Sequence, residues 1–170
     1  VVVAFNEQAL LGRHGLNALA PDAIILVENM WATHPDPDIR KKWADAMEEL
    51  STRDYTIIEV PMEEQCLTVV DNPRKGKNMF VLGMLCWVFD RDADRAKEQI
   101  AHAFRSKAPE ITERNHELLD LGYAWAGEHL DFRFEIPTME AGAPKVVMNG
   151  NEAIAMGAQA SGMDFMAMYP

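Results

Sequence analysis

Largely apolar runs and amphipathic stretches alternate along the first part of the chain. Three such runs, at residues 1–5, 23–27 and 55–60, have the length and β-branched content of buried strands. Between the runs, Asn6 is a suitable helix N-cap, and a Pro-Asp-Pro-Asp stretch precedes apolar positions at helical spacing over residues 39–50. This alternation of strand and helix predicts an α/β fold with a mostly parallel sheet flanked by helices.

The next part of the chain is predicted to be mainly helical. Pro61 suits the first position of a short helix, with two glutamates in its first turn. After a polar loop at residues 72–77, residues 79–89 are nearly all apolar, which predicts a buried helix. Two further amphipathic helices are expected at residues 93–104 and 110–130.

Residues 131–146 have the composition of a linker, because they hold two prolines and a glycine and show no periodic apolar pattern. A second unit then begins with a helix in which small residues recur at helical spacing. Gly162 fits the left-handed cap that ends it, and a short buried strand follows at residues 165–168. The predicted organisation is a first domain at 1–130, a linker at 131–146 and the first helix and strand of a second α/β domain at 147–170.

Both ends of the sequence read as buried strands. The chain begins on an apolar run without an initiator methionine, and it closes on a second strand pattern at residues 165–170. A strand buried on both faces needs neighbours on either side. We therefore expect this chain to be part of a longer polypeptide.

The composition favours a folded, cytoplasmic protein. Hydrophobic residues make up 48% of the chain and charged residues 25%, as in ordinary globular domains. The formal net charge of −11 disfavours nucleic acid as a partner, since phosphate backbones are repelled. No apolar run approaches the roughly 20 residues that span a bilayer, and no signal-peptide pattern is present. Cys66 and Cys86 lie apart in apolar segments and are expected to be reduced core thiols.

The familiar metal and nucleophile motifs are missing from the sequence. The five histidines show no i,i+4 pair and no cysteine at ligand spacing, and there is no C-x-x-C for an iron–sulfur cluster. Neither a G-x-S-x-G elbow nor a P-loop occurs. We therefore assign no catalytic residue and no metal ligand from these patterns.

A basic loop at residues 73–78 is the first candidate site. It places Arg74, Lys75 and Lys77 within four residues of an otherwise acidic chain, just before the predicted buried helix. A helix start offers unpaired N–H groups to an anion, and Gly76 permits close approach of a ligand to the backbone. The loop therefore suits a phosphate, although a solvated loop has the same composition.

The second candidate is the C-terminal segment. Tyr169 and Pro170 lie just past the end of the predicted terminal strand, which is where ligands sit in open α/β sheets. The same segment is also compatible with a simple helix–strand packing unit.

Several motifs along the chain resemble those of 2-oxoacid:acceptor oxidoreductases. Residues 150–155 and 167–170, Gly-Asn-Glu-Ala-Ile-Ala and Ala-Met-Tyr-Pro, resemble the opening of the pyrimidine-binding domain, best that of alpha subunits of the 2-oxoglutarate type. In many such enzymes a gamma domain is fused ahead of the pyrimidine-binding domain. Three upstream segments resemble that gamma domain: Ala4-Phe5-Asn6-Glu7, Gly76-Lys77-Asn78-Met79 with Gly83, and Asn115 followed by Gly122-Tyr123. The likeness covers essentially the whole chain, in the family's order.

The resemblance implies an enzyme that oxidatively decarboxylates a 2-oxoacid on thiamine diphosphate and releases an acyl-CoA. It also implies iron–sulfur clusters that pass electrons to ferredoxin or a similar acceptor. In this family thiamine diphosphate and Mg²⁺ are held mainly by a partner beta subunit, so a hetero-oligomer is expected. The chain alone is expected to be inactive.

Applied to single residues, the resemblance makes Lys77 the candidate for binding the anionic CoA, with Arg74 and Lys75 as weaker helpers. Tyr169 and Pro170 are the candidates on the side of thiamine diphosphate. Glu152, near the start of a helix, is not expected to be catalytic. A non-catalytic assembly module of a multisubunit complex is the alternative. A nucleotide-binding protein is disfavoured because no G-x-G-x-x-G follows a strand.

Overall fold

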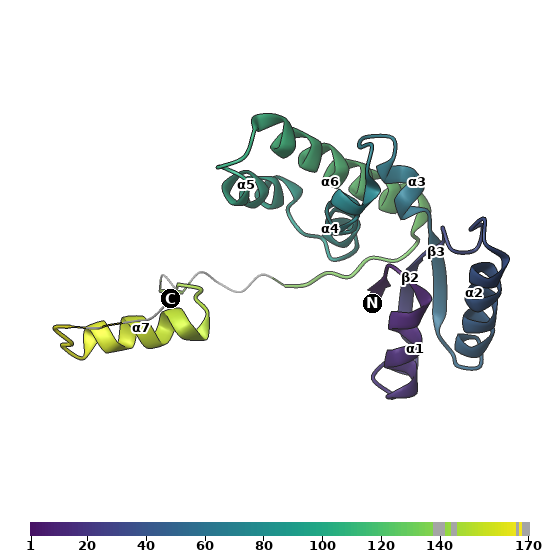
Figure 1. Cartoon of the computed structure of the whole chain (residues 1–170), viewed down its shortest axis with the longest axis horizontal. Coiled ribbons are helices and arrows are strands. Elements are labelled where there is room, and N and C mark those ends of the chain that lie inside the picture. Colours follow the sequence, from purple (N-terminus) through teal and green to yellow (C-terminus); the bar gives the residue numbers. More distant parts are fainter. Residues whose placement is uncertain (138–141, 144–145, 166, 168–170) are drawn as a thin grey trace. The chain divides into compact units, whose positions relative to one another are not determined.

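The computed structural model describes residues 1–137, 142–143, 146–165 and 167 of the chain. The chain divides into two compact units, Val1–Ile136 and Pro137–Pro170. The first unit holds the sheet and most of the helices, as the sequence of colours in Figure 1 shows. Its last residues lie six positions beyond the boundary predicted at residue 130.

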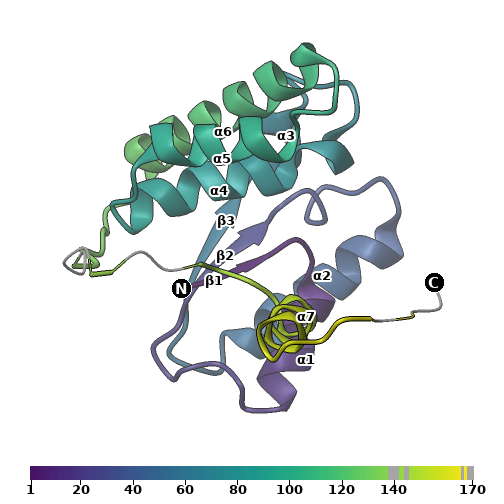
Figure 2. The ribbon, with the colours of Figure 1, turned by 90° about the vertical axis from the view of Figure 1, so that its left-hand side faces the viewer.

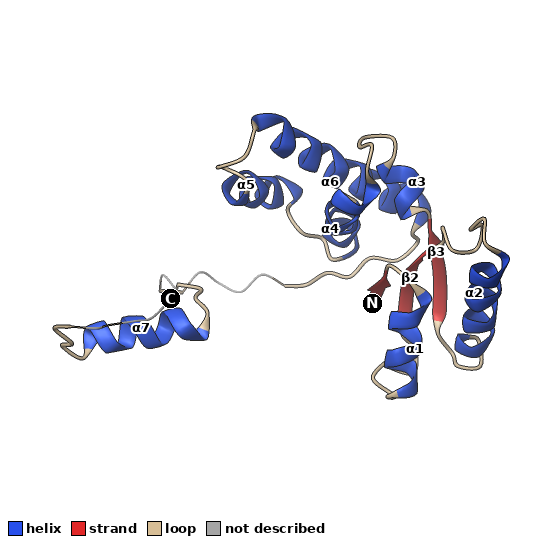
Figure 3. Cartoon of the chain, in the orientation of Figure 1, coloured by secondary structure: helices blue, strands red, loops and turns tan. Residues whose placement is uncertain are grey.

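A parallel sheet of three strands forms the centre of the first unit (Figure 3). The strands β1 (Val2–Ala4), β2 (Ile24–Glu28) and β3 (Thr56–Val60) lie in the order β1-β2-β3. Every residue of β2 after Ile24 is buried, because this strand has a neighbour on each side and helices over both faces. The predicted α/β fold with a mostly parallel sheet is confirmed.

The strand predicted at residues 1–5 was expected to be buried between neighbours, but β1 lies at an edge of the sheet. Within the described residues, β1 pairs only with β2. Val1 and Phe5 are each 42% exposed, so the apolar run is not buried along its whole length.

Two helices, α1 (Glu7–Gly15) and α2 (Pro37–Leu50), cover one face of the sheet (Figure 2). The predicted cap of α1 is confirmed, since the side chain of Asn6 accepts a hydrogen bond from the Ala9 N–H at 2.9 Å. Asp36 caps α2 in a similar way. The core on this face consists of Ala4, Leu10, Ala23, Ile25, Val27, Trp43 and Leu50.

The helices that follow β3 in the first unit lie on the other side of the sheet (Figure 2). Phe80, Met84 and Val88 on one of them, α4, share a core cluster with Leu26 of the central strand. The bounds of the four helices are α3 (Met62–Cys66), α4 (Lys77–Val88), α5 (Ala93–Ala103) and α6 (Pro109–His129).

Two glycines let the backbones of α4 and α6 come into direct contact. A Cβ atom added to Gly83 of α4 would overlap the backbone carbonyl of Leu119 in α6. One added to Gly122 of α6 would overlap the carbonyl of Phe80 in α4. The two glycines therefore serve one helix crossing, each making room for the other helix's backbone.

Residues 131–136, which the sequence assigns to a linker, are held against the end of α4. The N–H of Phe134 donates to the Val88 carbonyl at 2.7 Å, and its ring stacks on Phe89. Arg133 pairs with Asp90 at 2.6 Å and lies over the ring of Trp87. Aromatic and arginine contacts therefore fix a segment that has no periodic pattern.

The second unit contains the helix α7 (Gly150–Ala160). A capping box starts it: the side chain of Asn149 accepts from the Glu152 N–H at 2.9 Å, and Glu152 accepts from the Asn149 N–H at 3.0 Å. Gly162 adopts a left-handed φ of 86°, as predicted for the end of this helix. Of the predicted strand at 165–168, Phe165 and Ala167 are not in a strand, and the other residues lie outside the described ones. Among the described helices, none is both long and apolar enough to cross a bilayer.

Candidate functional site: a pocket at the carboxyl edge of the sheet

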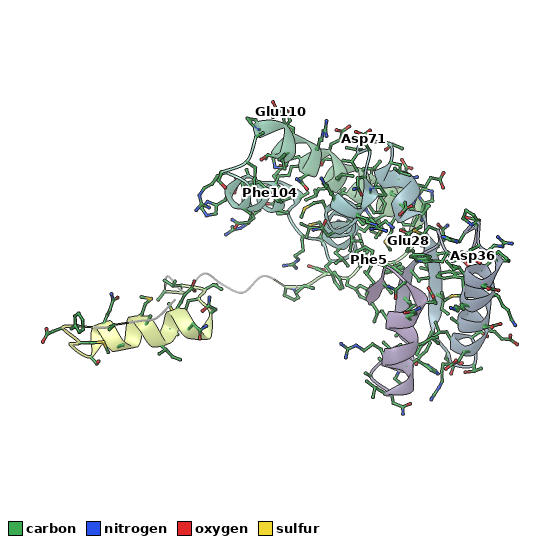
Figure 4. All side chains as sticks on the ribbon, in the orientation of Figure 1. Phe5, Glu28, Asp36, Asp71, Phe104 and Glu110 are labelled. Carbon is green, nitrogen blue, oxygen red and sulfur yellow. The ribbon has the colours of Figure 1, made fainter. Side chains whose placement is uncertain are left out.

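An open pocket lies where the three strands of the sheet end. Phe5 follows β1, Met30 and Trp31 follow β2, and Glu63 lies in the helix after β3. Figure 4 labels Phe5 and Glu28 at this end of the sheet. The basic loop and the first residues of α4 complete the wall, and the volume is about 740 Å³. Carboxyl edges of parallel strands are where α/β folds bind ligands. We refer to this cavity as the edge pocket.

The basic loop forms a turn of 3₁₀ helix, η1 (Pro73–Lys75), that the side chain of Asn72 caps through the Arg74 N–H at 3.1 Å. Arg74 and Lys75 are exposed and line the edge pocket. Neither side chain forms an ion pair with another described residue. The loop therefore offers two unpaired cations to a ligand.

Lys77, by contrast, is already paired. Its Nζ lies 2.8 Å from Oε2 of Glu28 and 2.8 Å from Oε2 of Glu63, and only 14% of the side chain is exposed. We call these three residues the charged triad. The three elements β2, α3 and α4 each contribute one member, so the triad fixes the start of α4 to the edge of the sheet.

Glu28 is the buried member of the triad, with no exposed surface. Besides Lys77, it accepts hydrogen bonds from the N–H of Glu63 at 3.0 Å and of Met30 at 3.3 Å. A buried carboxylate is tolerated only with such partners. Two carboxylates and one ammonium leave the triad with one negative charge in excess.

Burial and the carboxylates act on the pKa of Lys77 in opposite directions. Burial lowers the pKa of the ammonium group, but hydrogen bonds to Glu28 and Glu63 outweigh burial and raise it above its usual value. Lys77 is therefore a fixed cation. The nearby thiol of Cys66 is affected mainly by burial, which raises its pKa to about 11, so this thiol is not a nucleophile.

Gly76 has a packing role in the structure. A Cβ atom at this position would lie 2.6 Å from Cδ1 of Leu118 in α6. The missing side chain therefore lets the loop approach α6, whereas the sequence suggested close approach to a ligand.

The start of α4 contributes to the wall of the edge pocket. Lys77 and Asn78 both line the cavity, and no side chain caps the helix. The first N–H groups of a helix have no intrahelical partner and carry the positive end of its dipole. Two aromatic residues, Phe5 and Trp31, also line the cavity, and the Trp31 indole N–H donates to the Phe5 backbone carbonyl at 2.9 Å.

The structure thus brings Arg74, Lys75 and Lys77 together in one cavity but gives them different surroundings. Tyr169 and Pro170 lie outside the described residues. Sequence reasoning missed Glu28, Glu63 and the aromatic wall. One signal was present for Glu28, because a glutamate that directly continues a fully apolar strand needs a buried partner. Among the described residues, no cluster of histidine, cysteine and carboxylate side chains is arranged to hold a metal ion.

Comparison with known proteins supports the resemblance found in the motifs. Residues 1–125 match the family described as pyruvate ferredoxin/flavodoxin oxidoreductase. The chain is 31% identical over 173 aligned residues to the 2-oxoglutarate oxidoreductase subunit KorA of Mycobacterium tuberculosis, covering 95% of this chain and 26% of that protein.

A solved structure shares the fold. It is the 2-oxoglutarate:ferredoxin oxidoreductase from Magnetococcus marinus with 2-oxoglutarate, coenzyme A and succinyl-CoA bound, and the TM-score is 0.68 at 23% identity. The match covers 95% of this chain and 26% of that one. The chain therefore spans about a quarter of the length of both relatives. Because the family match extends over residues 1–125, the chain belongs to the pyruvate ferredoxin/flavodoxin oxidoreductase family.

Proposed function

We propose that the chain is part of a 2-oxoacid:acceptor oxidoreductase that converts a 2-oxoacid, 2-oxoglutarate in the first place, to an acyl-CoA. The relatives support this assignment, because both carry 2-oxoglutarate oxidoreductase in their names. Electrons would leave to ferredoxin or a similar acceptor through iron–sulfur clusters. In the assembled enzyme, thiamine diphosphate would supply the electron sink for decarboxylation, with Mg²⁺ and a beta subunit holding it. Tyr169 and Pro170 remain the candidates on this chain for contact with that cofactor.

The part played by residues 1–136 would be to bind CoA in the edge pocket. CoA is a polyanion with an aromatic base, and the pocket is lined by Arg74, Lys75 and the start of α4 together with Phe5 and Trp31. Cations and helix N–H groups bind phosphates, while aromatic rings accept a base by stacking. The observation that carries the proposal is this cavity with two unpaired cations, in a chain of net charge −11.

Lys77 also has one donor left for a ligand. An ammonium group has three N–H donors, and two of them point to the carboxylates of the charged triad. The third acceptor within reach is the thioether sulfur of Met30 at 3.4 Å, which is a weak one. Because Met30 lines the edge pocket, a phosphate oxygen that displaced this sulfur would meet the charge of Lys77.

The test is a double substitution, Arg74→Gln with Lys75→Gln, in the assembled enzyme. Two lost phosphate contacts should raise the KM for CoA at least tenfold, at about 1 kcal/mol or more per charge-assisted contact, and change kcat less. The matched control is Arg95→Gln with Lys107→Gln, which removes the same two charged groups from exposed positions on or just after α5. An unchanged KM for CoA in the first variant would contradict the proposal and favour the assembly module.

A further inference from the structure

Glu63 lines the edge pocket and contacts Lys77, which lines the same pocket. The side chain of Glu63 is 26% exposed, whereas Glu28 has no exposed surface. Glu28 alone suffices to neutralise Lys77, because their contact of 2.8 Å is a full ion pair. Glu63 therefore adds a negative charge at the wall where an anion would bind, and it occupies one of the three donors of Lys77.

From this geometry we infer that Glu63 limits the affinity of the edge pocket for its anionic ligand. The inference builds on the proposed CoA site and assigns to this residue a role in tuning release. An incoming phosphate has to share Lys77 with Glu63 and lie within a few ångströms of its carboxylate. Like charges at such distances oppose binding, the more so where protein walls reduce the screening by water. An acyl-CoA product must leave the enzyme, and a site without Glu63 would hold it longer.

A purely structural role for Glu63 predicts the opposite sign. If the carboxylate served only to hold the start of α4 against the sheet, its loss would loosen the loop that carries Arg74 and Lys75, and CoA would bind more weakly. The backbone contribution of this residue does not depend on its side chain, because Glu28 accepts a hydrogen bond from the Glu63 N–H at 3.0 Å. Glu63→Gln therefore removes the charge and keeps the shape and the backbone contact.

The decisive measurement is the Kd for CoA of the Glu63→Gln variant in the assembled enzyme. We expect the Kd to fall about five- to tenfold, as for removal of one like charge within several ångströms of a partly screened site. The control is Glu64→Gln, which removes the same charge from the neighbouring exposed residue that forms no ion pair with a described residue. The control should leave the Kd within twofold. The Glu63→Asp variant keeps the charge, so its Kd for CoA should stay close to that of the unchanged protein.

Ligand charge separates electrostatics from packing. Dephospho-CoA lacks one phosphate, so the gain in affinity of Glu63→Gln should be smaller for it than for CoA. A Kd that is unchanged or higher in Glu63→Gln, in protein that retains its melting temperature, overturns the inference.

The arginine and lysine variants tell this failure from a failure of the CoA site itself. If Arg74→Gln with Lys75→Gln weakens CoA binding while Glu63→Gln has no effect, the CoA site stands and only the role of Glu63 falls. If neither has an effect, the site is wrong and the inference falls with it.

Discussion

Two amphipathic helices, α1 and α2, cover one face of the sheet, whereas the other face carries α4, which is itself packed against α6. On the first face a helix needs one apolar side, so Trp43 and Leu50 point to the sheet and charged residues point to water. On the second face α4 has neighbours on both sides, and its sequence is apolar all round. Glycine has a different structural role in the helices of the two faces. In α1 it is a helix residue with open space around it, and in α4 and α6 it sets the distance between two backbones.

The largest effect is expected where α4 and α6 cross, if a side chain is placed between the two helices. Gly83→Ala and Gly122→Ala each put a methyl group onto a backbone carbonyl of the other helix, and a backbone cannot move aside as a side chain can. Each change should lower the free energy of unfolding by about 3 kcal/mol or more, as for severe overpacking. Urea denaturation of the chain measures it. A change below about 0.5 kcal/mol in both variants would contradict the close crossing.

A smaller effect should appear at alkaline pH, through the core that α3 and α4 share. The thiol of Cys66 has its pKa raised by burial from 9.0 to about 11, so above pH 9 the unfolded chain loses this proton first. The stability that this group contributes is thus fully present below pH 9 and is lost as the pH rises to about 11. Lys77, whose pKa is also raised, acts in the same direction above its usual 10.5.

We therefore expect the free energy of unfolding to fall by about 1 kcal/mol between pH 8 and pH 10 on account of Cys66. Denaturation curves at the two pH values measure it, with Cys66→Ala as the matched variant that lacks this contribution. A fall of the same size in that variant would exclude Cys66 as its source.

The smallest effect is expected on the face covered by α1 and α2. Gly12 lies inside α1 with nothing within 4 Å of an added Cβ, so Gly12→Ala gains helix propensity without a clash. The chain should become more stable by about 0.5–1 kcal/mol. A loss of stability, measured by the same denaturation curves, would show that this face is as closely packed as the other.

The sequence predicted the elements of both faces because their signals are local. Asn6 marks a helix start, Pro61 directly precedes a short helix, and the run at residues 79–89 is nearly all apolar. It did not predict the crossing of α4 and α6, because a helix that is apolar all round does not reveal which side faces which neighbour. Gly83 and Gly122 were noted for their family resemblance, and only the structure shows that they oppose each other's backbone.

For a similar reason, the sequence predicted the cations of the candidate site but not their ion pairs. The basic loop at residues 73–78 was visible in the sequence, since cations stand out in an acidic chain. The difference between Lys77, which is paired, and Arg74 and Lys75, which are not, depends on Glu28 and Glu63. These partners are 49 and 14 positions away from Lys77 in the sequence (77 − 28 and 77 − 63). Contacts of that separation leave no periodic pattern behind.

The capping box of α7 sets the start of a helix that has little else to stabilise it among the described residues of the second unit. The reciprocal bonds of Asn149 and Glu152 decide where this helix begins, yet a helix of 11 residues is too short to overcome the cost of nucleation in water. Ile154 and Met156 stay 73% and 54% exposed, so α7 gains little from burial within its own unit. The helicity of a peptide spanning residues 147–163 should therefore be low in water and rise when an apolar surface covers one of these two side chains.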